Sequence, residues 1–362
     1  MRSAAAPHAQ GTGEPRRRTA RATAAAAATV LALLLPLPAW AQADDRAGAA
    51  ALVDRTAADL GPLTAADIDR LMGEVSNWGR WGPQDQLGTL NLITADKRRW
   101  AAALVEDGVA VSLSHDMVRE STTEMGGPMG LEVVVLGDTT GFGGAVDAYT
   151  GHYHGYYYAH LDGLAHIAWK GKLYNGNPAA EITEDGAPKL GTEVMKHGMF
   201  TRGVLIDLPR FRGVPWLEPG TAVTTGELEA WERWSGVEIE PGDVLLVRTG
   251  RWAARQERGP WQARRLLAGL HASTAPWLHA RGIAAVGLDG VTDVLPSGVE
   301  GVGQPLHVLA IVGMGMPLFD NLHLERLAEE AAARGRHTFL FSVAPIRVPG
   351  GFGAPVNPLA IF

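Results

Sequence analysis

The segment Tyr158-Ala-His160-Leu-Asp162-Gly-Leu-Ala-His166 gathers imidazole and carboxylate side chains within a short stretch of the chain. Alternate residues of a β-strand face the same side, so His160 and Asp162 would converge on one point if this segment is extended. His166 follows a glycine-containing bend and could turn back over that point as a proton carrier, because imidazole titrates near neutral pH. Twelve histidines occur in the chain, and four lie within fifteen residues: His152, His154, His160 and His166.

A mixed set of imidazole and carboxylate ligands suits Zn²⁺, Mn²⁺ or Fe²⁺ better than Mg²⁺ or Ca²⁺. The chain contains no cysteine, which excludes a cysteine nucleophile and a cysteine-bound zinc. It also lacks the Gly-x-Ser-x-Gly motif of serine hydrolases. The segment therefore predicts a metal site built from histidine and carboxylate. The alternative is a polar strand edge whose histidines and tyrosines are ordinary surface residues.

Residues 1–43 have the composition of a secretory signal peptide. A basic stretch between positions 16 and 21 precedes an Ala/Leu-rich run over residues 24–37, and Ala41-Gln-Ala43 offers a small-x-small cleavage site. Pro36 and Pro38 argue against the alternative, an uncleaved membrane anchor. We expect an exported protein, periplasmic or secreted. The sequence leaves the choice between the general and the twin-arginine export routes open.

The charge of the chain narrows its range of partners. The formal net charge is −7, and residues 1–43 contribute a net +4, so the mature chain would carry −11. An acidic body argues against nucleic-acid binding, which requires a basic surface. We see no second transmembrane segment, so we expect no membrane attachment after cleavage. The expected partner is a small-molecule substrate.

Strand-like and helical patterns mix throughout the rest of the chain. Apolar runs predict strands at 109–113, 131–136, 204–208, 244–247, 283–288 and 339–343. Helices are predicted to start at Thr64 and Thr94 and to cover 225–234, 263–267, 273–280 and 322–333. We therefore predict an α/β fold: a single mixed domain with a β-rich core and flanking helices at 76–362, preceded by a helical extension at 44–75.

The Tyr158–His166 segment resembles the signature of the metal-dependent cyclase and kynurenine formamidase-like hydrolase family, commonly written His-x-Gly-Thr-His-x-Asp-x-Pro-x-His. The resemblance is to the longer bacterial branch and covers nearly all of residues 76–362. It implies a cyclase-like swivelling β/β/α fold and a homodimer or homotetramer. The other matching parts are the Trp78-Gly-Arg-Trp81-Gly-Pro block, Lys172–Gly176, Pro241–Gly250, Val286–Asp289, His307 with Asp320-Asn321, and the closing 350–358 segment.

Carried over by position, the resemblance makes His160 and Asp162 ligands of a divalent metal, Zn²⁺ or Mn²⁺, and His166 the catalytic histidine. His307 and Asp320 fall where the family often places a histidine and a carboxylate near the metal. Better-known members have glutamate at the position of Asp320, and the shorter aspartate would weaken a second metal position. The number of metal ions, one or two, stays open.

The first histidine of the signature falls on Tyr156 in this chain. His154 precedes it by two residues and is a further candidate ligand, with His152 a less favoured one. In a straight strand the Cα atoms of His154 and His160 would lie about 20 Å apart, too far for a shared metal. A bulge at Gly155 would remove that obstacle. Tyr156 itself is predicted to face the substrate.

Three further residues have two interpretations each. Trp78 and Trp81 would line an aromatic substrate pocket or serve as packing anchors. Asp289 would lie behind a metal ligand or cap a turn.

These observations predict a metal-dependent hydrolase of a C–N amide-type bond in a small, aromatic or cyclic substrate, similar to an arylformamidase. The metal would acidify a water molecule and polarise the substrate carbonyl, and His166 would move the proton to the leaving nitrogen. Two alternatives stay open. One is a metal-dependent lyase or dehydratase, because a metal and a histidine base also serve enolisation. The other is a periplasmic binding protein that has lost activity together with its first histidine.

Overall fold

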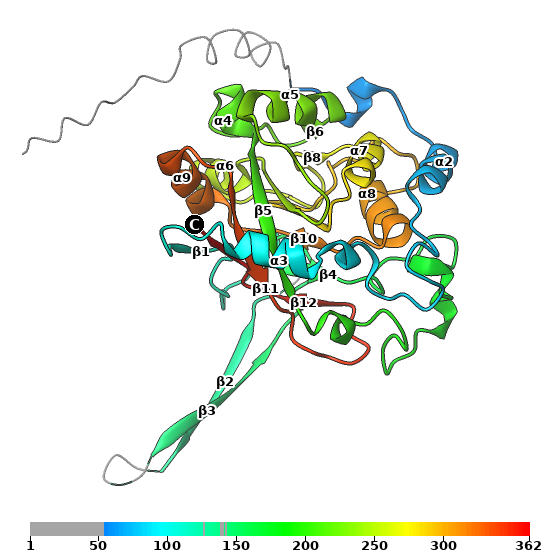
Figure 1. Ribbon diagram of the computed structural model, residues 1–362. Helices are drawn as coiled ribbons and strands as arrows, with labels where there is room; N and C mark the ends of the chain where they lie inside the picture. Colours follow the sequence, from blue (N-terminus) through cyan, green and yellow to red (C-terminus); the bar gives the residue numbers. More distant parts are fainter. Residues whose placement is uncertain (1–53, 126, 138–140, 142) are drawn as a thin grey trace, which may run out of the picture. The chain divides into compact units, whose positions relative to one another are not determined.

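Nine strands form the main sheet, in the order β1-β13-β11-β5-β7-β9-β10-β4-β12 (Figure 1). The computed structural model describes residues 54–125, 127–137, 141 and 143–362. Three neighbouring pairs in this sheet are parallel: β5 with β7, β7 with β9, and β9 with β10. The other pairs are antiparallel, so the sheet is mixed. The strands are β1 (Ala110–Ser112), β4 (His160–Asp162), β5 (Met199–Asp207), β7 (Val244–Arg248), β9 (Ala285–Leu288), β10 (Leu318–Asp320), β11 (Thr338–Val343), β12 (Gly353–Pro355) and β13 (Leu359–Ile361).

Short helices alternate with these strands. The α-helices are α2 (Ala65–Val75), α3 (Ala95–Ala102), α4 (Leu208–Arg212), α5 (Thr225–Ser235), α6 (Arg251–Arg258), α7 (Ala275–Ala280), α8 (Pro305–His307) and α9 (Glu325–Arg334). The 3₁₀ helices are η1 (Ala57–Leu60), η2 (Gly88–Leu92), η3 (Tyr174–Gly176), η4 (Ala179–Glu181), η5 (Thr192–Met195) and η6 (Ala272–Thr274), and η7 (Val308–Met314) is a π-helix.

The central strands β5, β7 and β9 supply the middle of the hydrophobic core. Val204, Leu246 and Val286, one from each strand, are fully buried. A parallel sheet covered on both faces requires such continuous apolar runs, which explains why these strands are recognisable in the sequence. Helices α3 and α9 both pack against β5 (Figure 1). The prediction of a mixed α/β domain with a β-rich core and flanking helices is confirmed.

Helix α2 begins at the predicted position because Thr64 and Asp67 form a reciprocal cap. The Thr64 hydroxyl oxygen accepts from the Asp67 N–H at 3.3 Å, and the Asp67 carboxylate accepts from the Thr64 N–H at 2.9 Å. Such a cap typically contributes about 1 kcal/mol. The buried face of the helix packs on η7, where Gly313 leaves room for the Met72 sulfur. This contact joins α2 to the segment that follows His307.

The helix predicted at 263–267 is wrong. This segment forms turns, and the Leu267 N–H donates to the Leu295 carbonyl in an antiparallel bridge. The bridge to Leu295 uses the backbone groups of Leu267 that a helix over this segment would need. Residues 1–53, which contain the predicted signal peptide and the start of the predicted helical extension, lie outside the described residues. The described part of the extension before Gly61 holds only the short helix η1.

Two small sheets complete the described strands. Strands β2 (Gly130–Leu136) and β3 (Gly144–Thr150) pair with each other, and β6 (Ala222–Val223) pairs with β8 (Gly269–Leu270). The sequence predicts β2 but not β3, whose Gly144-Ala-Val-Asp-Ala-Tyr-Thr150 run contains a single apolar β-branched residue. Among the described residues, no helix has both the length and the apolar character needed to cross a bilayer.

Candidate metal centre

Strand β4 lies between β10 and β12 and carries the first two predicted ligands. His160 stands opposite Asp320 in the antiparallel pair with β10, so their side chains share one face of the sheet. Asp162, two residues on, shares that face. All three residues are at most 2% exposed. The predicted extended geometry of the His160–Asp162 segment is therefore confirmed. It places the carboxylate of Asp320, which is distant in the sequence, beside His160 and Asp162.

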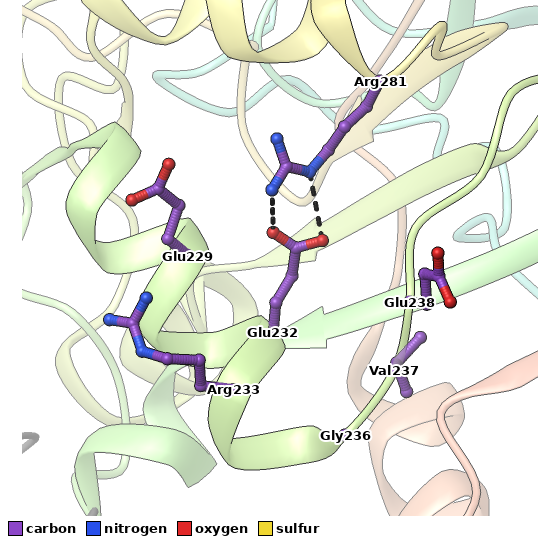
Figure 2. A pocket seen from close by; sticks show the side chains of 7 residues that line it. All are labelled: Glu229, Glu232, Arg233, Gly236, Val237, Glu238 and Arg281. Carbon is purple, nitrogen blue, oxygen red and sulfur yellow. Dashed lines mark hydrogen bonds and ion pairs between the residues drawn. The ribbon is translucent and has the colours of Figure 1, made fainter.

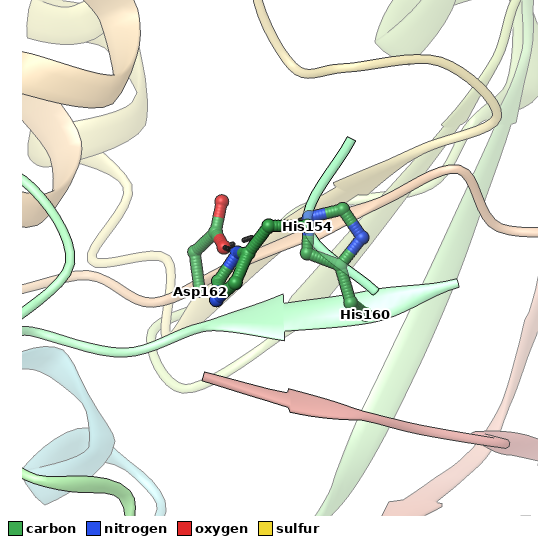
Figure 3. Close-up of side chains that lie close together, drawn as sticks. All are labelled: His154, His160 and Asp162. Carbon is green, nitrogen blue, oxygen red and sulfur yellow. Dashed lines mark ion pairs between the residues drawn. The ribbon is translucent and has the colours of Figure 1, made fainter. Parts of the chain in front are cut away.

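One oxygen of Asp162 is surrounded by three imidazoles. Its Oδ1 atom lies 3.0 Å from His154 Nδ1, 3.6 Å from His160 Nε2 and 3.7 Å from His166 Nε2. Figure 3 shows His154 and His160 converging on the Asp162 carboxylate. The His154 and His166 rings are stacked, with centroids 4.3 Å apart and planes 3° apart. These four side chains occupy one small volume.

The other oxygen of Asp162 faces a second pair of predicted residues. Its Oδ2 atom lies 3.4 Å from His307 Nε2, which in turn lies 3.3 Å from Asp320 Oδ2. Asp162 thus stands between two sets of groups. We call the whole assembly the His/Asp cluster; its members are His154, His160, Asp162, His166, His307 and Asp320.

The donor atoms of the cluster fit a divalent cation. The Oδ1 of Asp162 and the Nδ1 of His154 are buried, and neither makes a hydrogen bond. A buried carboxylate oxygen without a hydrogen bond is costly unless positive charge compensates it, from a protonated imidazole such as His154 at 3.0 Å or from a bound metal ion. Two sets of three residues have ligand atoms within 4.8 Å of one another: His154, His160 and Asp162, and Asp162, His307 and Asp320. Histidine with carboxylate is the ligand mix of zinc and manganese.

Hydrogen bonds behind the cluster orient two of the imidazoles. The Nδ1 of His160 lies 2.8 Å from the Tyr158 carbonyl, so it carries the proton and leaves the lone pair on Nε2. The Nδ1 of His307 lies 2.6 Å from Asp293 Oδ2 in the same way. Asp293 also accepts from the Leu306 N–H at 2.6 Å, at the start of α8. Carboxylates in this position are typical partners of metal-binding histidines.

Sequence reasoning missed Asp293. It lies fourteen residues before His307, in a segment without a recognisable motif, and only the fold brings the two together. A similar contact fixes Asp320, whose Oδ1 accepts from the Thr292 N–H at 3.0 Å and hydroxyl at 2.9 Å. Asp320 Oδ2 is thereby left facing His307.

The cluster shifts the pKa values of its members in opposite directions. Burial alone would raise the pKa of Asp162, but the neighbouring His160, with His154 and His307, holds it well below its usual range. Burial alone would lower the pKa of His307, but Asp320 and its hydrogen-bonded carboxylates raise it well above the ordinary value. Burial lowers the pKa of His166, although Asp162 opposes the shift. His166 is therefore a neutral imidazole at neutral pH.

His154 reaches the cluster because the chain bends after it. Gly155 has a φ of +153°, which glycine adopts readily, and this bend replaces the straight strand that would have kept His154 away. A Cβ atom on Gly353 would lie 2.7 Å from His154 Cε1, so the closing glycine-rich segment leaves room for the ring. His152 is exposed and lies outside the cluster.

Tyr156 is half-buried and packs on a small apolar group that includes Leu267 and Leu295. Burial and the negative charge of Asp320 raise the pKa of its phenol, although Arg264 opposes them. Asp289 caps the start of helix α6 instead of a turn of its own segment: its carboxylate accepts from the backbone N–H groups of residues 249–251 at 2.9, 2.7 and 3.1 Å.

The two predicted substrate-binding tryptophans are held elsewhere. Trp78 Nε1 donates to the Val312 carbonyl at 2.6 Å, and its ring packs beside Gly176. Trp81 lies under the Arg80 guanidinium, 4.7 Å from its carbon atom. These contacts do not include a member of the His/Asp cluster, so a role for either tryptophan in substrate binding stays a prediction.

A separate surface hollow of about 420 Å³ lies between α5 and α7 (Figure 2). Arg281 Nε donates to Glu232 there at 3.0 Å, so the two central charges compensate each other. The hollow shares no residue with the His/Asp cluster. Its lining residues are Glu229, Glu232, Arg233, Gly236, Val237, Glu238 and Arg281.

Comparison with known proteins assigns the chain to a family. Residues 101–292, more than half of the chain, match the Cyclase family model. The chain belongs to the Cyclase family. The predicted membership of the metal-dependent cyclase family is therefore confirmed. No curated protein matches this chain.

Solved structures resemble the cyclase to different degrees. The crystal structure of a novel cyclase is 28% identical, with a TM-score of 0.71, and the match covers 80% of this chain and 100% of that chain. Isatin hydrolase A from Ralstonia solanacearum is 18% identical, with a TM-score of 0.47, covering 70% of this chain and 91% of that chain. A predicted metal-dependent hydrolase from Bacillus stearothermophilus is 14% identical, with a TM-score of 0.43, covering 70% and 97%.

Proposed function

We propose that this cyclase is a metal-dependent hydrolase of a C–N amide-type bond. The observation that carries the proposal is the buried Oδ1 atom of Asp162, which has three imidazoles around it and no hydrogen bond. His154, His160 and Asp162 would hold one divalent ion, Zn²⁺ or Mn²⁺. Asp162, His307 and Asp320 would hold a second. When bound, the metal supplies positive charge that acidifies a water molecule and polarises a carbonyl.

His166 is the proton carrier in this proposal. It belongs to neither set of three ligands, and its side chain is 27% exposed, so the Nε2 atom is within reach of a substrate. Its lowered pKa keeps the imidazole neutral and able to accept a proton at Nε2. The water adds to the carbonyl carbon, the C–N bond breaks, and the proton taken from water passes to the leaving nitrogen. Stacking on His154 fixes the ring during these steps.

Two tyrosine side chains support a proposal for the class of substrate. The Tyr153 ring lies 4.5 Å from the His154 ring and 6.2 Å from the His160 ring, and the half-buried Tyr156 is predicted to face the substrate. Such neighbours favour a small planar substrate over a long flexible one. We therefore propose an aryl formamide or a cyclic aromatic amide as the substrate class.

Hydrolysis in ¹⁸O-labelled water tests the reaction class. The purified cyclase, loaded with Zn²⁺ or Mn²⁺, should release a carboxylate product that carries the label, because only hydrolysis places solvent oxygen there. A lyase or dehydratase would leave the product unlabelled, and a binding protein would give no product. Asp162→Asn should abolish turnover. His152→Ala is the matched control, because His152 belongs to the same histidine-rich segment but lies exposed outside the cluster.

We further propose that the cyclase acts outside the cytoplasm and assembles as a homodimer or homotetramer. The signal-peptide composition of residues 1–43 supports export, and the family resemblance supports self-association. Cell fractionation of the full-length chain and light scattering of the mature chain test these two statements separately.

A further inference from the structure

The chain forms a bend between two of the proposed ligands, His154 and His160, before strand β4 begins at His160. Three carbonyl groups in this bend, those of Gly155, Tyr156 and Tyr158, accept hydrogen bonds from buried side chains. A loop held in this way cannot straighten without leaving buried polar groups unpaired. The donors of these bonds therefore control where the ligands before and after the bend lie.

Asn321 supplies two of the three bonds. Its Nδ2 atom donates to the Gly155 carbonyl at 2.8 Å and to the Tyr158 carbonyl at 3.3 Å. The residue is fully buried and has a φ of +58°, a left-handed conformation that asparagine tolerates better than most residues. It also follows Asp320 directly in the chain. One side chain thus connects the neighbourhoods of three members of the cluster.

The Tyr158 carbonyl links Asn321 to the protonation of His160. This oxygen lies 2.8 Å from His160 Nδ1 and 3.3 Å from the Asn321 amide nitrogen. It therefore accepts two hydrogen bonds at once. Asn321 holds the carbonyl, and the carbonyl holds the proton on Nδ1, which leaves the Nε2 lone pair of His160 directed at Asp162.

Arg251 orients Asn321 from behind. Its Nη1 donates to Asn321 Oδ1 at 2.6 Å, which directs the amide nitrogen towards the bend. Its Nη2 donates to the Tyr156 carbonyl and lies 3.6 Å from the buried carboxylate of Glu124. The Arg251 side chain is 2% exposed, and its hydrogen bond to Asn321 is buried. Buried charge-assisted bonds of this kind are costly to break.

We infer that Asn321 and Arg251 are positioning residues that set the metal affinity of the His/Asp cluster. They hold the bend that lets His154 occupy the cluster in a chain whose family-signature histidine is replaced by Tyr156. The inference rests on the proposed function, because it presupposes that the cluster binds a metal. Neither residue touches the substrate or the reacting atoms in this account. Loss of such an outer partner typically weakens metal binding by about 10–100-fold.

Asn321→Gly tests the inference, because glycine keeps the left-handed backbone and removes only the amide. Asn175→Gly is the matched control: Asn175 has a φ of +59°, and its amide also bridges two carbonyls, at 3.1 and 3.3 Å, on Gly82 and Asp85. The Zn²⁺ Kd is measured by competition with a chromophoric chelator. The absorption spectrum of the Co²⁺-loaded protein reports ligand geometry, and the melting temperature of the metal-free protein reports stability.

Asn321→Gly should weaken Zn²⁺ binding by about 10-fold or more and change the Co²⁺ spectrum. Asn175→Gly should lower the melting temperature by a similar amount and leave the Kd and the spectrum unchanged. Equal Zn²⁺ affinity in Asn321→Gly and the parent protein would overturn the inference, and so would an equal loss in Asn175→Gly. If Asn321→Gly does not fold, Arg251→Lys takes its place. The expected loss of Zn²⁺ affinity is the same, and an unchanged Zn²⁺ affinity would again overturn the inference.

Asp162→Asn separates failure of the inference from failure of the proposed function. If Asp162→Asn abolishes Zn²⁺ binding while Asn321→Gly has no effect, the cluster binds metal and only the positioning role is wrong. If the parent protein binds no Zn²⁺, or Asp162→Asn binds it equally well, the proposed metal site is wrong and the inference falls with it.

Discussion

The Nδ1 atom of His154 lies 3.0 Å from the Oδ1 atom of Asp162, and both atoms are buried without a hydrogen bond. Two polar atoms in such a position are unfavourable in isolation, because burial removes the water that would otherwise solvate them. A divalent cation that binds both atoms would satisfy them together. The bend after His154 brings its ring to this place, whereas a straight strand would hold His154 too far from His160 to share a metal with it.

Replacing His166 with alanine should separate chemistry from metal binding. His166→Ala removes the proton carrier but none of the six atoms in the two proposed ligand sets. We expect a loss of about 10²–10⁴-fold in kcat with a metal content equal to that of the parent protein. Steady-state kinetics and elemental analysis of the same preparation check this. Loss of the metal together with activity would show that His166 is a ligand instead.

Replacing His154 should weaken the metal site, whereas replacing Tyr156 should not. His154→Ala removes a proposed ligand. Loss of a residue that only hydrogen-bonds a ligand raises the Kd by about 10–100-fold, and the Zn²⁺ Kd of His154→Ala should rise by more than that. Tyr156→Phe should keep the Kd and raise KM, because only a substrate-facing hydroxyl is lost. Chelator competition and kinetics measure both. An unchanged Kd in His154→Ala would show that His154 is not a ligand and would leave His160, Asp162, His307 and Asp320 as the site.

Asp293→Asn should weaken metal binding through His307. The Asp293 carboxylate lies 2.6 Å from His307 Nδ1 and fixes the tautomer that directs Nε2 at the cluster. An amide can present its NH₂ group there instead, which disfavours that tautomer. We expect a Zn²⁺ Kd about 10-fold higher. Asp289→Asn, a change in another buried capping carboxylate, should lower stability without this loss. Equal effects of the two variants on the Kd would refute a specific role for Asp293.

The stability of the fold should fall on acidification because of His115. Burial, with the charges of His323, Arg251 and Arg255, lowers the pKa of His115 to about 3. The folded state therefore favours the neutral ring. The stabilisation is fully present above the unfolded pKa of about 6.5 and is lost as the pH falls from there towards 3, by up to about 1.4 kcal/mol per pH unit.

His115→Phe should reduce this loss, since it keeps the edge contact with Trp252, 4.2 Å away between ring centroids, and removes the titration. Urea unfolding at pH 7 and pH 5 compares the two proteins. The free energy of unfolding should drop less in the variant than in the parent. An identical drop would assign the acid sensitivity to other groups.

Local spacing was sufficient to predict one part of the candidate site and insufficient for another. His160 and Asp162 alternate along one strand, so their convergence follows from strand geometry alone. Asp293, Asn321 and Arg251 come from three separate segments, and their contacts depend on how β9, β10 and α6 pack. No pattern within a short window reports such packing, which is why the sequence did not indicate Asp293 or Arg251 and showed Asn321 only as part of a family-matching segment, without a role.

The same distinction explains the outcome for the fold. Strands β5, β7 and β9 are recognisable because burial on both faces demands continuous apolar runs. The 263–267 segment has an apolar pattern of helical spacing, but Leu267 pairs with Leu295 from a distant part of the chain. His154 could be predicted only in part. Its residue type indicated a possible ligand, but whether it reaches the cluster depends on the bend at Gly155.

The metal content of purified Asp162→Asn, measured beside that of the parent protein by inductively coupled plasma mass spectrometry, shows whether the His/Asp cluster binds a metal. Asp162 belongs to both proposed ligand sets, so one isosteric change should disable the whole centre. We expect stoichiometric Zn²⁺ or Mn²⁺ in the parent after dialysis and almost none in Asp162→Asn, with both proteins folded by circular dichroism. Equal metal content in the two proteins, or a metal-free parent that still hydrolyses amides, would contradict this expectation.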